Sequence, residues 1–93
     1  MDHRDITNEK LLEARLNKKV KEAGGWSIKM LSTHLTGLPD RLCLLPGEKL
    51  FFAEIKSPGK KPTKIQKFVM NKIRALGFKV YIIDSIKSLN EAI

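Results

Sequence analysis

The fold is decided by residues 39–56, which read PDRLCLLPGEKLFFAEIK. Pro46-Gly47-Glu48 is turn-forming sequence between two apolar runs, so the stretch predicts a β-hairpin with strands at 40–45 and 49–56. Apolar residues occupy both parities of each strand, whereas a sheet with one wet face would alternate apolar and polar side chains. We therefore expect a sheet with both faces covered by helices.

The segments before the hairpin predict a helix and a first strand. Residues 7–23 carry an apolar stripe at helical spacing, and the pair Gly24-Gly25 ends it. Residues 26–31 are a plausible strand, and residues 32–38 are polar and contain a glycine, which indicates a loop. The predicted core-facing side chains of this helix are Leu12, Leu16, Val20 and Ala23, with Leu11 beside them.

The segments after the hairpin predict helix, strand and helix. Thr63 to Gln66 fits a capping box, and Gly77 ends the helix that it opens. Residues 78–84 form a strand and residues 85–93 a short helix. The order is then α-β-β-β-α-β-α, an α/β mixed sheet with helices on both faces, in one domain over 1–93. The last strand follows a helix, so it should pair in parallel with an earlier strand. The predicted buried stripe of the second helix is Ile65, Phe68, Val69, Ile73 and Leu76.

Three charged residues should meet at one end of the hairpin. If Leu45 faces Lys49, then Asp40 faces Glu54 with the Cβ atoms about 5 Å apart, and Lys56 shares that face. Two close carboxylates repel each other unless they are protonated or bridged by a cation. Oxygen ligands suit Mg²⁺ or Mn²⁺, which polarises a phosphorus centre, while a lysine can hold the attacking water. The alternative is an exposed cross-strand set of charges.

A basic segment follows this site. The chain has a net charge of +8, and residues 56–79 hold eight Lys or Arg and no acidic residue. Such a segment beside a candidate active site favours phosphate contact, although a solvated basic face is the alternative. Base stacking is not expected, because aromatic residues are not regularly interleaved with the basic ones. The residues predicted to contact DNA are Lys60, Lys61, Lys64 and Lys67.

Several other classes of site are not expected. Cys43 lies in an apolar run, which predicts a small buried hydrophobe and not a nucleophile. His3 and His34 are far apart and no His/Cys cluster accompanies them, which argues against zinc. No phosphate loop for a nucleotide cofactor is present. No apolar run approaches the roughly 20 residues of a membrane span, and the polar N-terminus is no signal peptide, so a cytoplasmic protein is expected.

Two stretches together resemble a known family. They are Gly37-Leu38-Pro39-Asp40-Arg41 and Phe52-Ala53-Glu54-Ile55-Lys56-Ser57-Pro58-Gly59-Lys60, followed by Gln66. With Glu13 and Gly24-Gly25 upstream and residues 77–80 downstream, they resemble the VRR-NUC (virus-type replication-repair nuclease) branch of the PD-(D/E)xK superfamily. The resemblance implies a restriction-endonuclease-like fold and Mg²⁺- or Mn²⁺-dependent hydrolysis of DNA. It also implies a homodimer acting on branched DNA such as four-way junctions.

The resemblance also implies roles for single residues. Asp40 and Glu54 match the metal-binding acids, and the carbonyl of Ile55 matches a backbone metal ligand. Lys56 matches the catalytic lysine, and Gln66 matches a glutamine that supports the lysine or the attacking water. The capping box is an alternative role for Gln66.

The acid contributed by the first helix is less clear-cut. Glu13 matches the family's first-helix acid and lies beside the apolar stripe, so it is preferred for catalysis and metal binding. Glu9, four residues earlier on the same helical face, is its rival. Lys29 is a weaker candidate for facing the site, because an exposed strand lysine is the more common case.

Two functions compete with the nuclease. One is a catalytically silent nucleic-acid-binding module of the same fold, against which the joint presence of Asp40, Glu54, Lys56 and Gln66 argues. The other is an interaction subunit with a charged sheet end, which would need no metal. The dimer surface is not determined by sequence, and the first helix and the apolar residues near Trp26 and Met30 are the candidates.

Overall fold

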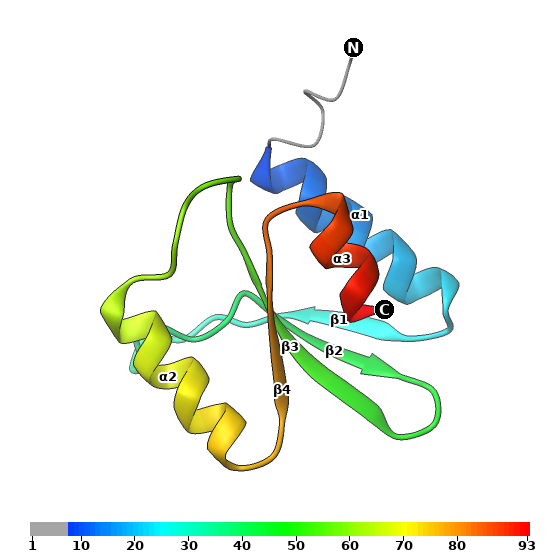
Figure 1. Ribbon diagram of the computed structural model, residues 1–93. Coiled ribbons are helices and arrows are strands. Elements are labelled where there is room, and N and C mark those ends of the chain that lie inside the picture. Colours follow the sequence, from blue (N-terminus) through cyan, green and yellow to red (C-terminus); the bar gives the residue numbers. More distant parts are fainter. Residues whose placement is uncertain (1–7) are drawn as a thin grey trace.

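The structure is a computed structural model, and it describes residues 8–93 as one four-stranded sheet with three helices (Figure 1). The elements in chain order are α1 (Glu9–Glu22), β1 (Trp26–Lys29), β2 (Arg41–Leu45), β3 (Lys49–Ile55), α2 (Lys64–Ala75), β4 (Lys79–Ile83) and α3 (Ile86–Ala92). This order and the mixed α/β class confirm the prediction. Asn8 caps α1 by accepting from Lys10 N, one residue after the predicted start at Thr7. Thr7 and His3 lie outside the described residues.

The sheet has the order β1-β2-β3-β4. The first three strands are antiparallel, and β4 runs parallel to β3, as expected for a strand that follows a helix. Leu45 pairs with Lys49 across a turn in which Gly47 and Glu48 both have positive φ, 83° and 63°. Turns of that kind match the twist of a hairpin. Continuing this register by one residue places Asp40, just before β2, opposite Glu54.

Helices α1 and α3 cover one face of the sheet (Figure 1). The predicted stripe of α1 is buried except at its end, where Ala23 is exposed. Complete burial of a leucine stabilises a fold by about 1.5–3 kcal/mol, so this layer is the main core. Its buried members are Leu12, Leu16 and Val20 from α1, Cys43, Phe51, Ala53, Ile55 and Ile83 from the sheet, and Leu89 from α3.

Helix α2 lies on the other face, and here the predicted stripe is partly wrong. Val69 and Met70 are the buried residues of α2, although Met70 was not predicted. Ile65, Phe68 and Leu76 are 46%, 62% and 76% exposed. The reason is position, because α2 packs mainly on β4 at the edge of the sheet. Only part of its apolar arc therefore meets the sheet.

Helices lie on both faces of the sheet, as predicted, although they leave part of the α2 face open. On the α2 side, no helix packs over β1 and β2 within residues 8–93. Trp26, which pairs with Leu44 on this side, is 66% exposed. Among the described helices, none is long and apolar enough to cross a membrane.

Candidate active site at the open end of the hairpin

Asp40 is held at the entrance to β2 by both its backbone and its side chain. Its carbonyl accepts a hydrogen bond from Met30 N at 2.9 Å, which extends the pairing of β1 with β2. Its Oδ2 accepts from Ile55 N at 2.7 Å. The carboxylate therefore bridges the two strands of the hairpin, and a charge-assisted bond of this kind is about twice as strong as a neutral one.

Glu54 is the one buried charged side chain among residues 8–93, with 3% of its surface exposed. Its Oε2 accepts a hydrogen bond from Gln66 Nε2 at 3.0 Å and lies 3.5 Å from Lys56 Nζ. Burial, reinforced by the nearby charge of Asp40, raises the pKa of Glu54 to about 7, and Lys56 opposes that rise. The site thus keeps a carboxyl group in a place where a negative charge is unfavourable without further cations.

Gln66 makes two sets of contacts at the same time. Its backbone N–H donates to Thr63 Oγ1 at 3.2 Å, and its Oε1 accepts from Thr63 N at 2.9 Å, which completes the predicted capping box. The remaining amide nitrogen donates to Glu54. Its role as a helix cap and its contact with the candidate site, which the sequence posed as alternatives, therefore occur together.

Lys56 follows β3 and extends its pairing with β4, because Lys56 N donates to Ile83 O at 2.9 Å. Its side chain is only 16% exposed, and its ammonium group lies beside Glu54. Asp40, Glu54, Lys56 and Gln66 are thus connected by direct contacts around the Glu54-Ile55 peptide.

The two acids of α1 have different neighbours. Glu13 Oε2 is 2.8 Å from Arg41 Nε and 3.3 Å from Lys29 Nζ. Burial tends to raise the pKa of Glu13, but hydrogen bonds and charges from these two cations hold the pKa below its usual 4.5. Lys29, the weaker candidate for the site, is engaged in this same cluster.

Glu9 is the acid that contacts the loop after Lys56. Its Oε2 accepts hydrogen bonds from Ser57 N at 3.1 Å and from Ser57 Oγ at 3.0 Å. The preference for Glu13 over Glu9 therefore stays a prediction, and the contacts favour Glu9 as the closer neighbour. The sequence analysis assigned no role to Ser57, although Ser57 lies in the stretch that carries the family resemblance.

Cys43 belongs to the main core and not to the site. Its side chain is fully buried, and burial raises the pKa of its thiol. A thiol in such surroundings is a poor nucleophile, because the reactive form is the thiolate.

Comparison with known proteins settles the family. No family model matches the chain. A protein named "Putative nuclease p44", from Acyrthosiphon pisum secondary endosymbiont phage 1, is 39% identical over 80 residues, which cover 86% of each chain. A solved structure described as a VRR_NUC domain superposes with a TM-score of 0.84 at 25% identity, covering 89% of this chain and 90% of the other. The chain belongs to the VRR-NUC family. The resemblance seen in the sequence is thereby confirmed, together with the fold that it implied.

The residues at the candidate site are of the kind that a hard divalent cation prefers. Asp40 and Glu54 bring carboxylate oxygens together, with Oδ2 of Asp40 accepting from Ile55 N and Oε2 of Glu54 accepting from Gln66 Nε2. No cluster of three or more His, Cys, Asp or Glu able to hold a metal occurs within residues 8–93. An ion held here would complete its coordination with backbone carbonyl and water oxygens, which is the usual arrangement for Mg²⁺.

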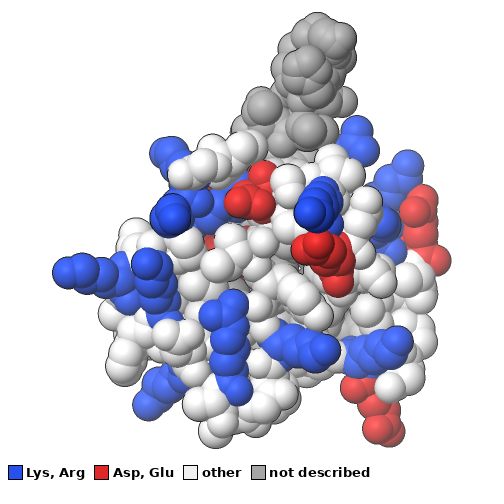
Figure 2. All heavy atoms as spheres, in the orientation of Figure 1, with Lys and Arg blue, Asp and Glu red and all other residues white. Residues whose placement is uncertain are grey.

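The basic segment of the VRR-NUC domain lies next to these carboxylates. Lys60, Lys61, Lys64 and Lys67 are all exposed, on the loop after β3 and the first turn of α2. Within residues 8–93 no carboxylate forms an ion pair with any of them. Figure 2 shows Lys and Arg without Asp or Glu over α2, on the left of the molecule. This surface is therefore electrostatically suited to a polyanion.

Proposed function

We propose that this VRR-NUC protein is a metal-dependent DNA endonuclease that hydrolyses phosphodiester bonds. The observation that carries the proposal is the buried Glu54, which touches Gln66 and Lys56 and whose pKa is raised partly by Asp40. A fold rarely keeps a buried carboxyl group beside a second one unless a cation or a reaction needs it. The exposed lysines beside the site support a DNA substrate.

In the proposed mechanism, Asp40, Glu54 and the carbonyl of Ile55 hold Mg²⁺ or Mn²⁺. The ion supplies positive charge that polarises the phosphorus centre and stabilises the leaving oxygen. Lys56 donates a hydrogen bond to the attacking water and stabilises the negative charge that develops. Gln66 keeps the Glu54 carboxylate in one orientation, because the capping box anchors its own side chain. Glu13 is retained as a proposed contributor from α1, with Glu9 as the alternative.

We further propose that the substrate is branched DNA, such as a four-way junction, and that the protein is a homodimer. Support comes from the family resemblance and from geometry, since two strands are cut most simply by two sites related by a two-fold axis. The candidate dimer surface is the face of β1 and β2 that carries Trp26, on the α2 side of the sheet, where no described helix packs. Sedimentation at working concentration should give twice the monomer mass, and a monomer would contradict this part. The phage relative supports a bacterial or phage protein that acts in the host cytoplasm. We treat residues 1–93 as one nuclease domain.

The test is cleavage of a labelled panel consisting of linear duplex, single strand, flap, splayed arm and four-way junction. We expect cutting with Mg²⁺ or Mn²⁺, none with EDTA, and preference for branched substrates. Lys56→Ala should lower the rate by at least about 100-fold, as expected on removal of a group that stabilises charge in the transition state. Lys49→Ala is the matched control, because it removes the same charge from the exposed far end of β3.

Two outcomes would contradict the proposal. A protein that bound junctions but cut nothing with either metal would be a catalytically silent binding module. Cleavage that survived Lys56→Ala would show that the residues around Glu54 are not the catalytic site.

A further inference from the structure

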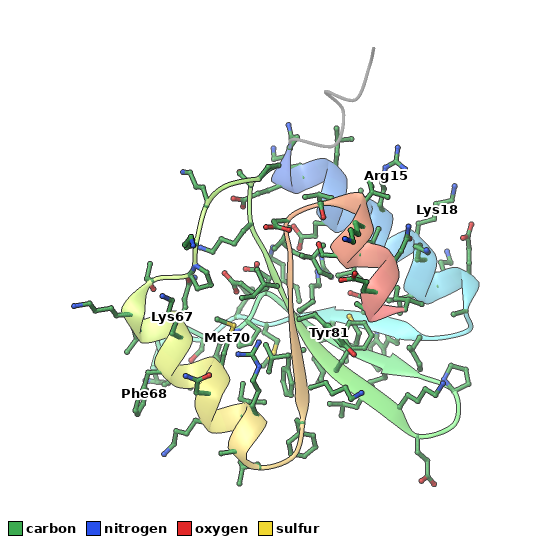
Figure 3. The ribbon with its side chains drawn as sticks, viewed as in Figure 1. Arg15, Lys18, Lys67, Phe68, Met70 and Tyr81 are labelled. Carbon is green, nitrogen blue, oxygen red and sulfur yellow. The ribbon has the colours of Figure 1, made fainter. Side chains whose placement is uncertain are left out.

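Phe68 is an exposed aromatic side chain on the outer side of α2. It is 62% exposed, and Figure 3 shows it turned away from the sheet, whereas Met70 on the same helix points towards the sheet. Sequence periodicity placed Phe68 in the core, and the basic segment was separately not expected to stack bases. The first prediction is wrong, because Phe68 lies in solvent among the lysines of α2.

Phe68 lies among the lysines of α2, and one of them contacts its ring. Lys72 Nζ lies 5.9 Å from the ring centroid, in cation–π geometry. Lys64 is one turn before Phe68 and Lys72 one turn after it, so all three occupy the same side of the helix. Lys67 is the neighbouring exposed residue. Within residues 8–93 none of these lysines is paired with a carboxylate.

We propose that Phe68 is a stacking platform for an unpaired base of the DNA substrate, with Lys64, Lys67 and Lys72 contacting the adjacent phosphates. An aromatic side chain within a positively charged surface is the arrangement with which proteins bind single-stranded nucleic acid. This inference rests on the proposed function. Within the class of branched DNA it favours substrates with an unpaired segment near the cut, such as a flap or a splayed arm, over a fully paired four-way junction.

The charges favour a nucleic acid over a second copy of the chain as the occupant. Docking two copies through Phe68 would bring together two sets of lysines with no carboxylates between them, in a protein of net charge +8. Like charges juxtaposed at an interface are strongly unfavourable. A strand of DNA instead brings both the phosphates and the flat apolar surface that the two kinds of side chain can contact.

The position of Phe68 connects this surface with the active site. Gln66, which donates to Glu54, lies two residues earlier, a rise of about 3 Å along the helix axis but about 200° around it, so Phe68 faces away from Glu54 on the opposite side of α2. A strand whose phosphate reaches Asp40 and Glu54 would therefore pass around the first turns of α2, a helix about 10 Å wide, to bring a base to Phe68. The unpaired base on Phe68 would lie within a few nucleotides of the scissile bond.

The experiment measures binding in EDTA, where no cleavage occurs. The probes are a single-stranded 15-mer and a splayed-arm DNA, each with 2-aminopurine in the unpaired segment, and a blunt duplex for comparison. Wild-type protein should quench the 2-aminopurine fluorescence, because stacking on the ring brings the base into contact with it. Phe68→Ala should abolish the quenching and weaken single-strand affinity about tenfold, the usual cost of losing one base–aromatic stack. Blunt-duplex affinity should change little.

Two further variants serve as controls. Phe68→Trp should restore both the quenching and the affinity, because the larger ring also stacks. Leu76→Ala removes an exposed apolar side chain from the end of the same helix, and it should leave binding unchanged.

Three results with Phe68→Ala would overturn the inference. The first is an unchanged affinity for single-stranded DNA, and the second is an equal loss of affinity for single-stranded and duplex DNA. The third is conversion of a dimer to a monomer, which would assign the ring to a protein interface. The outcome is separable from that of the proposed function. If the wild-type protein stacks a base but never cuts, only the nuclease proposal fails. If the wild-type protein cuts DNA and the Phe68→Ala variant binds single strands as tightly as the wild type, only the stacking proposal fails.

Discussion

Replacing Glu54 with glutamine should stabilise the metal-free protein above pH 7. The pKa of Glu54 is raised from 4.5 to about 7, so the folded protein holds a proton that the unfolded chain releases. Below pH 4.5 the carboxyl group of Glu54 is protonated in both the folded and the unfolded state, so it adds no electrostatic cost to folding. Between pH 4.5 and 7 stability is lost as the pH rises, and above pH 7 the ionised group costs about 3 kcal/mol relative to a neutral one.

The assay is urea unfolding of both proteins in EDTA, followed by circular dichroism. Glu54→Gln should match the wild type near pH 4 and exceed its free energy of unfolding by about 3 kcal/mol at pH 8. Glutamine retains a carbonyl oxygen that can accept from Gln66 and Lys56, so the packing is preserved. Glu48→Gln, an exposed change in the hairpin turn, is the control and should show no such difference.

Addition of metal supplies the second half of this test. If a divalent cation binds the carboxylates, Mg²⁺ at pH 8 should stabilise the wild type and have little effect on Glu54→Gln. A Glu54→Gln protein that is no more stable than the wild type at pH 8, or a difference that does not vary with pH, would refute the electrostatic account of this site.

Three further predictions concern other parts of the molecule. Glu13→Gln should lower the free energy of unfolding by about 1–3 kcal/mol, because it leaves the half-buried Arg41 without its carboxylate; urea unfolding measures this, and an unchanged midpoint would contradict it. Gly25→Ala should cost about 1–3 kcal/mol in the same assay, since a Cβ there would lie 2.2 Å from the carbonyl oxygen of Leu44, and a neutral effect would show that the strand ends yield easily. Lys64→Ala should reduce the slope of log affinity against log salt by about 0.7 on single-stranded DNA, whereas an unchanged slope would remove Lys64 from the phosphate-contacting set.

Much of the candidate site follows from short-range sequence features. A three-residue turn sets the pairing of Leu45 with Lys49, and strand geometry then places Asp40 opposite Glu54 with Lys56 on the same face. The capping box likewise follows from four consecutive residues, and it determines where Gln66 lies relative to its helix. These features are predictable because a few backbone dihedral angles in each determine them.

The positions of the helices on the sheet could not be read in this way. Periodicity marked one apolar arc on α2, but only the tertiary structure shows that this helix lies over the edge strand β4, which buries Met70 and leaves Phe68 in solvent. The same holds for α1, where Glu9 and Glu13 share a helical face and only packing separates the acid beside Ser57 from the one beside Arg41. Sequence thus determined the hairpin with its three charges, since neighbouring residues specify it. Tertiary structure decided which helical side chains reach those charges, since that depends on contacts between segments far apart in the chain.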